Sequence, residues 1–168
     1  MPVMGFAAPS GTGKTTLMAG VIEALSQAGF NTAALKHGHH PADPDVPGKD
    51  THRFRQAGAQ TVIFASSERW FLIQDLKEQP EPSLNDLTQH LGGHDLILVE
   101  GYKNDDHPKI LIHRAGVTPA KGIPPLTNVV AIATDDPQLE ADRPRLALND
   151  PQEVAAFIQK FLGLKKPA

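Results

Sequence analysis

A short stretch near the amino terminus constrains the fold of this chain more than any other. Residues 1–7 read MPVMGFA and are almost all apolar, whereas residues 8–16 read APSGTGKTT. The apolar letters predict a buried strand over residues 3–8. The loop that follows is rich in glycine, serine and threonine and holds one lysine. Such a loop is suited to phosphate, because its backbone N–H groups can converge on an anion.

The spacing of the loop fits the P-loop pattern, with Ala8 in the first glycine position and Gly13, Lys14 and Thr15 at its end. We expect the N–H groups of residues 11–15 to face one concavity at the positive end of the next helix. Lys14 would reach the β- and γ-phosphates of a nucleotide, and the Thr15 hydroxyl would ligate Mg²⁺. A tight turn with these letters by chance is the alternative, but the flanking strand and amphipathic helix favour nucleotide binding.

Apolar periodicity predicts alternating strands and helices along the rest of the chain. Helices are expected over residues 14–28, 50–57 and 83–91 and from Asp150 onward. Strands are expected over residues 3–8, 32–36, 61–66, 69–74, 95–101, 109–114 and 129–134. The third and fourth of these strands form a predicted hairpin. The pattern is that of an α/β layered domain, with a mostly parallel sheet and an antiparallel hairpin.

Two of the helices carry start signals. Asp50 is the expected N-cap of the helix over residues 50–57. Asp150 and Glu153, with Pro151 at the first helical position, match the capping-box pattern. The buried stripe of this last helix is predicted to be Val154, Phe157, Ile158 and Phe161.

Length and composition narrow the class of protein. At 168 residues the chain can bury a core, and we expect one nucleotide-binding domain over residues 1–168. The net charge of −3 argues against nonspecific nucleic-acid binding, and the lack of cysteine excludes disulfides and thiolate metal sites. The amino-terminal apolar run is too short for a signal peptide or a membrane span. We therefore expect a cytoplasmic protein that binds neither nucleic acid nor membrane.

A P-loop protein also needs an acidic group near its magnesium ion. Glu100 ends the apolar run DLILVE, where the strand emerges beside the P-loop. Asp50 is the second candidate, and its metal role is compatible with a capping role. Lys36 ends a predicted strand at the same edge and would neutralise charge on the γ-phosphate. The candidate catalytic residues are Lys14, Lys36 and Glu100.

Residues 36–40 read KHGHH and form a second unusual stretch. His37, His39 and His40, with His52 nearby in sequence, would permit a zinc or nickel site if the loop gathered their imidazoles. Spacing alone leaves this open. A polar loop that senses phosphate or binds an anionic partner is the favoured alternative.

Four segments together point to a family: the P-loop, LKHGHH, GKDTHRFRQAGA and DLILVEGYK. With them the chain resembles the MobB family of molybdopterin-guanine dinucleotide biosynthesis adaptor proteins, as far as the final helix. The resemblance implies a P-loop NTPase fold in three α/β/α layers, related to dethiobiotin synthetase and the nickel-insertion GTPases. It implies a homodimer that binds GTP and Mg²⁺ and is a weak GTPase. It also implies a partner, the guanylyltransferase MobA, which joins GMP to molybdopterin; molybdopterin itself is a further candidate ligand.

The resemblance also implies roles for single residues. The phosphates would be cradled by Ser10, Gly11, Thr12, Gly13, Lys14, Thr15 and Thr16. Thr15, Asp50 and Glu100 would surround Mg²⁺, and Lys36 and Lys103 would belong to the same pocket.

The reader of the base is less marked in the sequence. The segment ATDDP lies where related GTPases carry Asn-Lys-x-Asp, and it lacks that motif. Either Asp135 or Asp136 would accept two N–H bonds from guanine, and Asp135 is the preferred candidate.

Two other functions compete with the adaptor GTPase. A small-molecule kinase or ATP-dependent ligase would use Lys14, Lys36 and the acidic pair for phosphoryl transfer, but such enzymes often carry an arginine-rich lid, which is not evident here. A pure binding module would hold nucleotide without chemistry. We find no arginine or glutamine in an obvious position to stabilise the transition state, which agrees with slow hydrolysis.

The predicted hairpin over residues 61–74 bears on assembly. Five of its residues are more apolar than a lone hairpin can keep exposed: Val62, Phe64, Trp70, Phe71 and Ile73. They either pack in the core or meet another subunit. Both can hold, because alternate residues of a strand face opposite sides.

Overall fold

The computed structural model describes residues 1–9, 11–38, 42–117 and 126–165. The chain divides into two compact units. The first unit comprises Met1–His37 and Leu84–Ala168, and the second comprises Gly38–Ser83. The expectation of a single domain over residues 1–168 stays a prediction.

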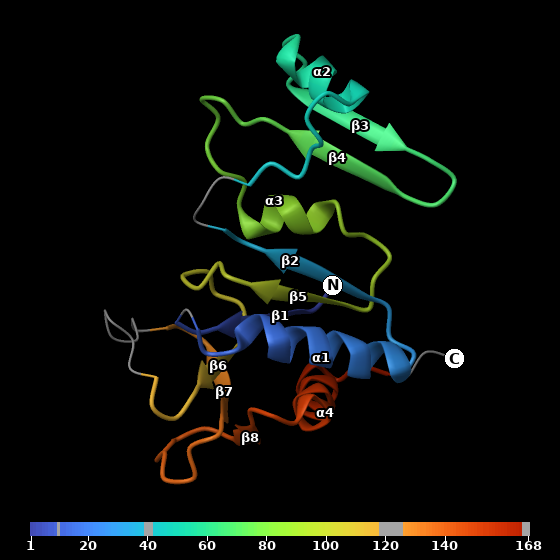
Figure 1. Cartoon of the computed structure of the whole chain (residues 1–168). Coiled ribbons are helices and arrows are strands. Elements are labelled where there is room, and N and C mark those ends of the chain that lie inside the picture. The colour runs from blue at the N-terminus through green and yellow to red at the C-terminus, as the bar shows by residue number, and fades with distance from the viewer. Residues whose placement is uncertain (10, 39–41, 118–125, 166–168) are drawn as a thin grey trace. The chain divides into compact units, whose positions relative to one another are not determined.

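The first unit is built on a six-stranded sheet in the order β2-β5-β1-β6-β7-β8 (Figure 1). Its strands are β1 (Val3–Ala7), β2 (Thr32–Lys36), β5 (Leu96–Glu100), β6 (Lys109–His113), β7 (Val129–Thr134) and β8 (Arg145–Ala147). Every neighbouring pair is parallel. The carboxyl ends of the strands therefore lie at one edge of the sheet, which is where ligands bind in open α/β folds.

Helices cover both faces of this sheet. They are α1 (Lys14–Gln27), α3 (Leu84–Gln89) and α4 (Pro151–Leu162). Leu96 and Leu98 of β5 belong to the core cluster that α1 and α4 complete. Ile97 and Val99 belong to a second cluster, which includes Leu84 of α3. Because β5 is buried on both faces, its sequence is a continuous apolar run. The predicted three-layer α/β/α fold is confirmed.

The second unit holds α2 (Asp50–Gln56) and a separate antiparallel sheet of β3 (Thr61–Ala65) and β4 (Trp70–Gln74). The predicted hairpin is confirmed. Arg55 braces the unit, because its guanidinium pairs with the carboxylates of Asp43, Asp45 and Asp75 at 2.9–3.1 Å. These pairs tie the segment before α2 to the residue after β4.

The observed elements differ from the predicted ones in one additional strand and in the N-cap of one helix. The strand β8 was not predicted, because it has three residues and only Leu146 is buried. Asp50 is the first residue of α2 and not its N-cap, so that prediction is wrong. The N-cap is Lys49, whose carbonyl accepts the Arg53 N–H at 2.9 Å.

The last helix begins as predicted but does not follow the predicted pattern throughout. Asp150 caps α4 by accepting two backbone N–H bonds. The other half of the predicted capping box is wrong, because the Glu153 carboxylate accepts the Ala147 N–H at 3.0 Å while the Asp150 N–H donates to the Ala147 carbonyl at 3.1 Å. The Glu153 bond ties β8 to α4. Phe161 was expected to be buried but is 47% exposed and stacks on Phe157 at the rim of the core. In the described part of the chain, no helix has the length and apolarity needed to cross a bilayer.

A buried histidine of the first unit lies against β1. His107 is 7% exposed, and neither ring nitrogen has a hydrogen-bond partner among the described residues. A Cβ atom on Gly5 would lie 2.4 Å from its Nε2, so only glycine leaves room for this ring. Burial first, and then the charge of Lys109, lowers the pKa of His107 to about 4.

We predict that His107 makes the free energy of unfolding depend on pH. The unfolded histidine titrates near 6.5, so between that value and about 4 the unfolded state binds more protons than the folded state. Stability should therefore fall as the pH drops, by about 2 kcal/mol between pH 7 and 4.5. Urea unfolding of the wild type and His107→Gln at both pH values measures this. The variant should lose less stability than the wild type, and equal losses would contradict the assignment.

Candidate functional site

The P-loop joins β1 to α1 at the carboxyl edge of the parallel sheet. Gly11 and Gly13 have φ values of 79° and 87°, in the left-handed region that favours glycine. Gly13 is the N-cap of α1, and no side chain of the described residues caps that helix end. The N–H groups of the first turn are therefore available to an anion. The Thr12 hydroxyl closes the loop by donating to the Pro9 carbonyl at 3.0 Å.

A pocket of about 320 Å³ opens over this loop. Its lining residues are Pro9, Gly11, Gly13, Lys14, Thr15, Thr16 and Glu100. Most of the residues predicted to cradle phosphate therefore line one cavity. Thr12 is buried within the loop, and Ser10 lies outside the described residues.

Glu100 is the point on which the predicted site residues converge. Its Oε2 accepts a hydrogen bond from the Thr15 hydroxyl at 3.0 Å. Its Oε1 lies 3.1 Å from the Lys36 Nζ and 3.5 Å from the Lys14 Nζ. Glu100 is the last residue of β5, and the register of β2 places Lys36 directly beside it. The three candidate catalytic residues thus lie together, although their catalytic roles stay predictions.

The charges around Glu100 keep its carboxylate ionised. Burial alone would raise the pKa of Glu100, but hydrogen bonds from Lys36 and Thr15 and the charge of Lys14 lower it below the ordinary value. Two ammonium groups face one carboxylate here, so the cluster has an excess of positive charge. This excess positive charge would attract an anion at the mouth of the P-loop.

The oxygen atoms at this point fit a magnesium ion. Mg²⁺ prefers carboxylate, hydroxyl and phosphate oxygens and binds through few protein groups. The Thr15 hydroxyl and the Glu100 carboxylate are adjacent oxygen ligands of this kind. Asp50 begins α2 in the second unit, and its predicted place beside the metal stays a prediction.

The segment after β5 approaches the end of β2 closely. A Cβ atom on Gly101, whose φ is +104°, would lie 2.6 Å from the Cβ of His37. The His37 N–H donates to the Glu100 carbonyl at 2.8 Å, and the His37 ring lies 4.6 Å from that of Tyr102. These contacts hold Lys36 beside Glu100. Lys103 follows as an exposed residue, and its place in the pocket stays a prediction.

The histidine-rich stretch is described only in part. Among residues with a described position, no group of three or more His, Asp or Glu side chains could hold a metal ion. His39 and His40 lie outside those residues, and His52 belongs to the second unit. The zinc or nickel hypothesis therefore stays untested.

Arg114 was not singled out from the sequence, where no arginine stood in an obvious position to stabilise the transition state. It follows β6, and its Nε donates to the Thr12 carbonyl at 3.0 Å. Its Nη1 donates to Oδ2 of Asp135 at 3.2 Å. The only sequence signal was its position at the end of a predicted strand, which did not reveal that this strand lies next to β1.

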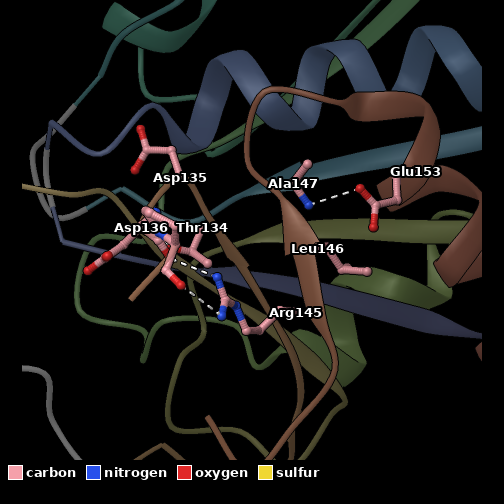
Figure 2. A pocket seen from close by; sticks show the side chains of 8 residues that line it. Thr134, Asp135, Asp136, Arg145, Leu146, Ala147 and Glu153 are labelled. Atoms are coloured by element: carbon pink, nitrogen blue, oxygen red, sulfur yellow. Dashed lines mark hydrogen bonds between the residues drawn. The ribbon is translucent and has the colours of Figure 1, made fainter. Parts of the chain in front are cut away.

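A second pocket, of about 580 Å³, lies where β7 and β8 end and α4 begins (Figure 2). Arg145 donates to the carbonyls of Asp136 and Pro137 and thereby holds the loop after β7. The Asp136 carboxylate accepts the Gln138 N–H at 2.9 Å within the same turn. In Figure 2 the Asp135 carboxylate points away from Arg145. The two candidate base readers therefore have different surroundings, and neither role is tested.

Comparisons with known proteins agree on one family. The family model described as "Molybdopterin guanine dinucleotide synthesis protein B" matches residues 3–135. The chain is 39% identical over 166 residues to the molybdopterin-guanine dinucleotide biosynthesis adapter protein of Escherichia coli (strain K12), covering 96% of this chain and 94% of that protein. The adapter protein of the same name from Haemophilus influenzae is 40% identical over 166 residues, with 96% and 90% covered.

Solved structures with the same fold carry the same family name. The MobB homolog from Bacillus stearothermophilus superposes with a TM-score of 0.71 at 22% identity, covering 98% of this chain and all of that one. Bacillus subtilis MobB gives a TM-score of 0.73 at 24% identity, with 99% and 100% covered. Because the family model spans most of the chain and two relatives are about 40% identical over nearly all of it, the chain belongs to the MobB family of molybdopterin-guanine dinucleotide biosynthesis adapters.

Proposed function

We propose that this adapter binds GTP with Mg²⁺, hydrolyses it slowly and acts beside a MobA-like guanylyltransferase that works on molybdopterin. One observation carries the proposal: Lys14, Lys36 and Thr15 meet on the ionised carboxylate of Glu100 beneath an uncapped helix end. This arrangement presents positive charge, backbone donors and oxygen ligands for Mg²⁺ around one cavity.

The contacts of the cluster suggest how a triphosphate would bind. Phosphate oxygens would take the N–H groups at the start of α1 and the ammonium of Lys14. Lys36 would then also face the terminal phosphate, because its ammonium pairs with the same Glu100 oxygen as the ammonium of Lys14. Mg²⁺, when held by Thr15 and Glu100, supplies charge neutralisation to the phosphates.

Slow hydrolysis agrees with the position of Arg114. Its guanidinium is engaged by the Thr12 carbonyl and the Asp135 carboxylate. A free arginine or an oriented glutamine at the terminal phosphate is worth about 10³–10⁵ in rate. An arginine committed to these contacts does not supply that effect, so faster turnover would need a group from a partner.

Asp135 is our proposed reader of guanine. A carboxylate can accept the N1–H and N2–H of guanine together, whereas adenine offers no such pair of donors. Asp135 lines the 580 Å³ pocket, which has room for a purine base. Asp136 accepts one N–H within its own turn, whereas Asp135 accepts donors from Arg114 and Ala115, which follow the neighbouring strand β6 and so link Asp135 to the P-loop side of the sheet.

Equilibrium binding of fluorescent GTP and ATP analogues, with Mg²⁺ and then with EDTA, tests this proposal. The GTP analogue should bind more tightly than the ATP analogue, and removal of Mg²⁺ by EDTA should weaken the binding of the GTP analogue. Lys14→Ala should weaken GTP binding by roughly tenfold or more, since it removes a charge-assisted contact. Glu100→Gln should lose most of the difference between Mg²⁺ and EDTA.

A matched control is Lys160→Ala on the exposed side of α4, which should bind GTP as the wild type does. Preference for ATP would contradict the guanine assignment and favour a kinase or ligase. A wild type that binds equally well in Mg²⁺ and EDTA would contradict the proposed metal ligands.

We further propose that the hairpin of the second unit is the homodimer contact. Ile63, Trp70 and Leu72 point to one face of the β3–β4 sheet and are 61%, 65% and 43% exposed. On the other face Val62 is only 7% exposed, whereas Phe64 and Phe71, which stack 5.2 Å apart, are 42% and 39% exposed. Thus Val62 is a core residue, and the face of Ile63, Trp70 and Leu72 is the more exposed apolar surface, which a second copy would cover.

Ile63→Glu should convert the dimer to a monomer in sedimentation equilibrium, because it would bury a charge in that contact. Val46→Glu is the matched control, since Val46 is a β-branched residue of the same unit and is 57% exposed. The control should stay dimeric. A wild type that sediments as a monomer, or an Ile63→Glu dimer as stable as the wild type, would contradict the assignment.

A further inference from the structure

Three loops of the first unit lie next to one another along one edge of the sheet. The strands β1, β6 and β7 are neighbours in that order, and all are parallel. The P-loop follows β1, Arg114 follows β6 and Asp135 follows β7. The topology therefore places Arg114 between the phosphate loop and the carboxylate proposed to read the base.

The guanidinium of Arg114 contacts both neighbours at once. Its Nε donates to the Thr12 carbonyl at 3.0 Å, and its Nη1 donates to Oδ2 of Asp135 at 3.2 Å. Its Nη2 would lie 2.9 Å from a Cβ atom on Gly13, so the guanidinium lies close against the P-loop backbone. The Ala115 N–H donates to the other oxygen of Asp135 at 2.7 Å.

These contacts suit arginine in particular. The planar fork of a guanidinium presents several N–H donors in fixed directions, whereas a lysine offers a single ammonium. Thr12 is 2% exposed, so its carbonyl has little access to water and gains from the Arg114 donor. A carboxylate has roughly four lone-pair sites, and Arg114 and Ala115 use two of those on Asp135. Within the described part of the chain no other group donates to this carboxylate, which leaves two sites for the N–H groups of a base.

We propose that Arg114 is a positioning residue that couples base recognition by Asp135 to phosphate binding by the P-loop. The inference rests on the proposed function, since it concerns how that nucleotide site works. With Arg114 in place, the carboxylate is held at a fixed orientation relative to Thr12 and Gly13. A nucleotide with the right base then binds to a carboxylate and a P-loop that are already aligned with each other. A ligand without a base does not contact Asp135, so its affinity does not depend on this alignment.

The test compares GTP with inorganic tripolyphosphate, which has the phosphates but no base. Arg114→Ala should weaken the binding of GTP by about tenfold and the binding of tripolyphosphate by less than about threefold. Asp135→Ala should show the same selectivity, and the double variant should lose little more for GTP than either single one. Arg114→Lys, which retains the charge and one donor, should recover part of the GTP affinity. Circular dichroism of each variant checks that it is folded.

Arg143→Ala is the matched control, because Arg143 is an exposed arginine of the same unit. It should bind both ligands as the wild type does. An equal loss of GTP and tripolyphosphate in Arg114→Ala would show a merely structural brace and overturn the inference, as would additive losses in the double variant. A wild type that binds neither ligand would overturn the proposed function itself, and the inference with it.

Discussion

The site depends on the ionised carboxylate of Glu100. It is the acceptor for two ammonium groups and one hydroxyl that come from distant parts of the sequence. Without it, the positive charges of Lys14 and Lys36, which both lie within 3.5 Å of the same carboxylate oxygen, would repel each other. The pKa of Glu100 is held below its ordinary value despite burial, so the carboxylate keeps this role at neutral pH. Phosphates would compete with it for the same lysines.

The parallel sheet explains why these groups meet. Each of five neighbouring strands ends at the same edge, and each contributes one element to the site. In sheet order these are Lys36, Glu100, the P-loop, Arg114 and Asp135. The groups proposed to bind phosphate and the base thus lie in a row, and the register of β2 and β5 places the first pair side by side. The apolar hairpin belongs to the second unit and is our proposed homodimer contact.

Much of this was predictable where the sequence signal is local. The P-loop letters, the twice-buried run of β5 and the amphipathic helices were predicted within a few residues, because periodicity and glycine positions depend on near neighbours. The strand β8 was not predicted, because three residues are too few to show a hydrophobic period. Arg114 was not singled out because its contacts depend on the order of the strands. Glu153 was placed in a capping box, and its bond to Ala147 was missed because that bond joins a helix to a strand.

A crystal structure of the full chain with Mg²⁺ and a non-hydrolysable GTP analogue would test the central claim most directly. We predict phosphate oxygens on the N–H groups of Gly13–Thr16, the Lys14 Nζ on phosphate rather than on Glu100, and Mg²⁺ beside Thr15 and Glu100. A nucleotide bound elsewhere, or an occupied P-loop in which both lysines still pair with Glu100 and no metal lies beside it, would contradict the account.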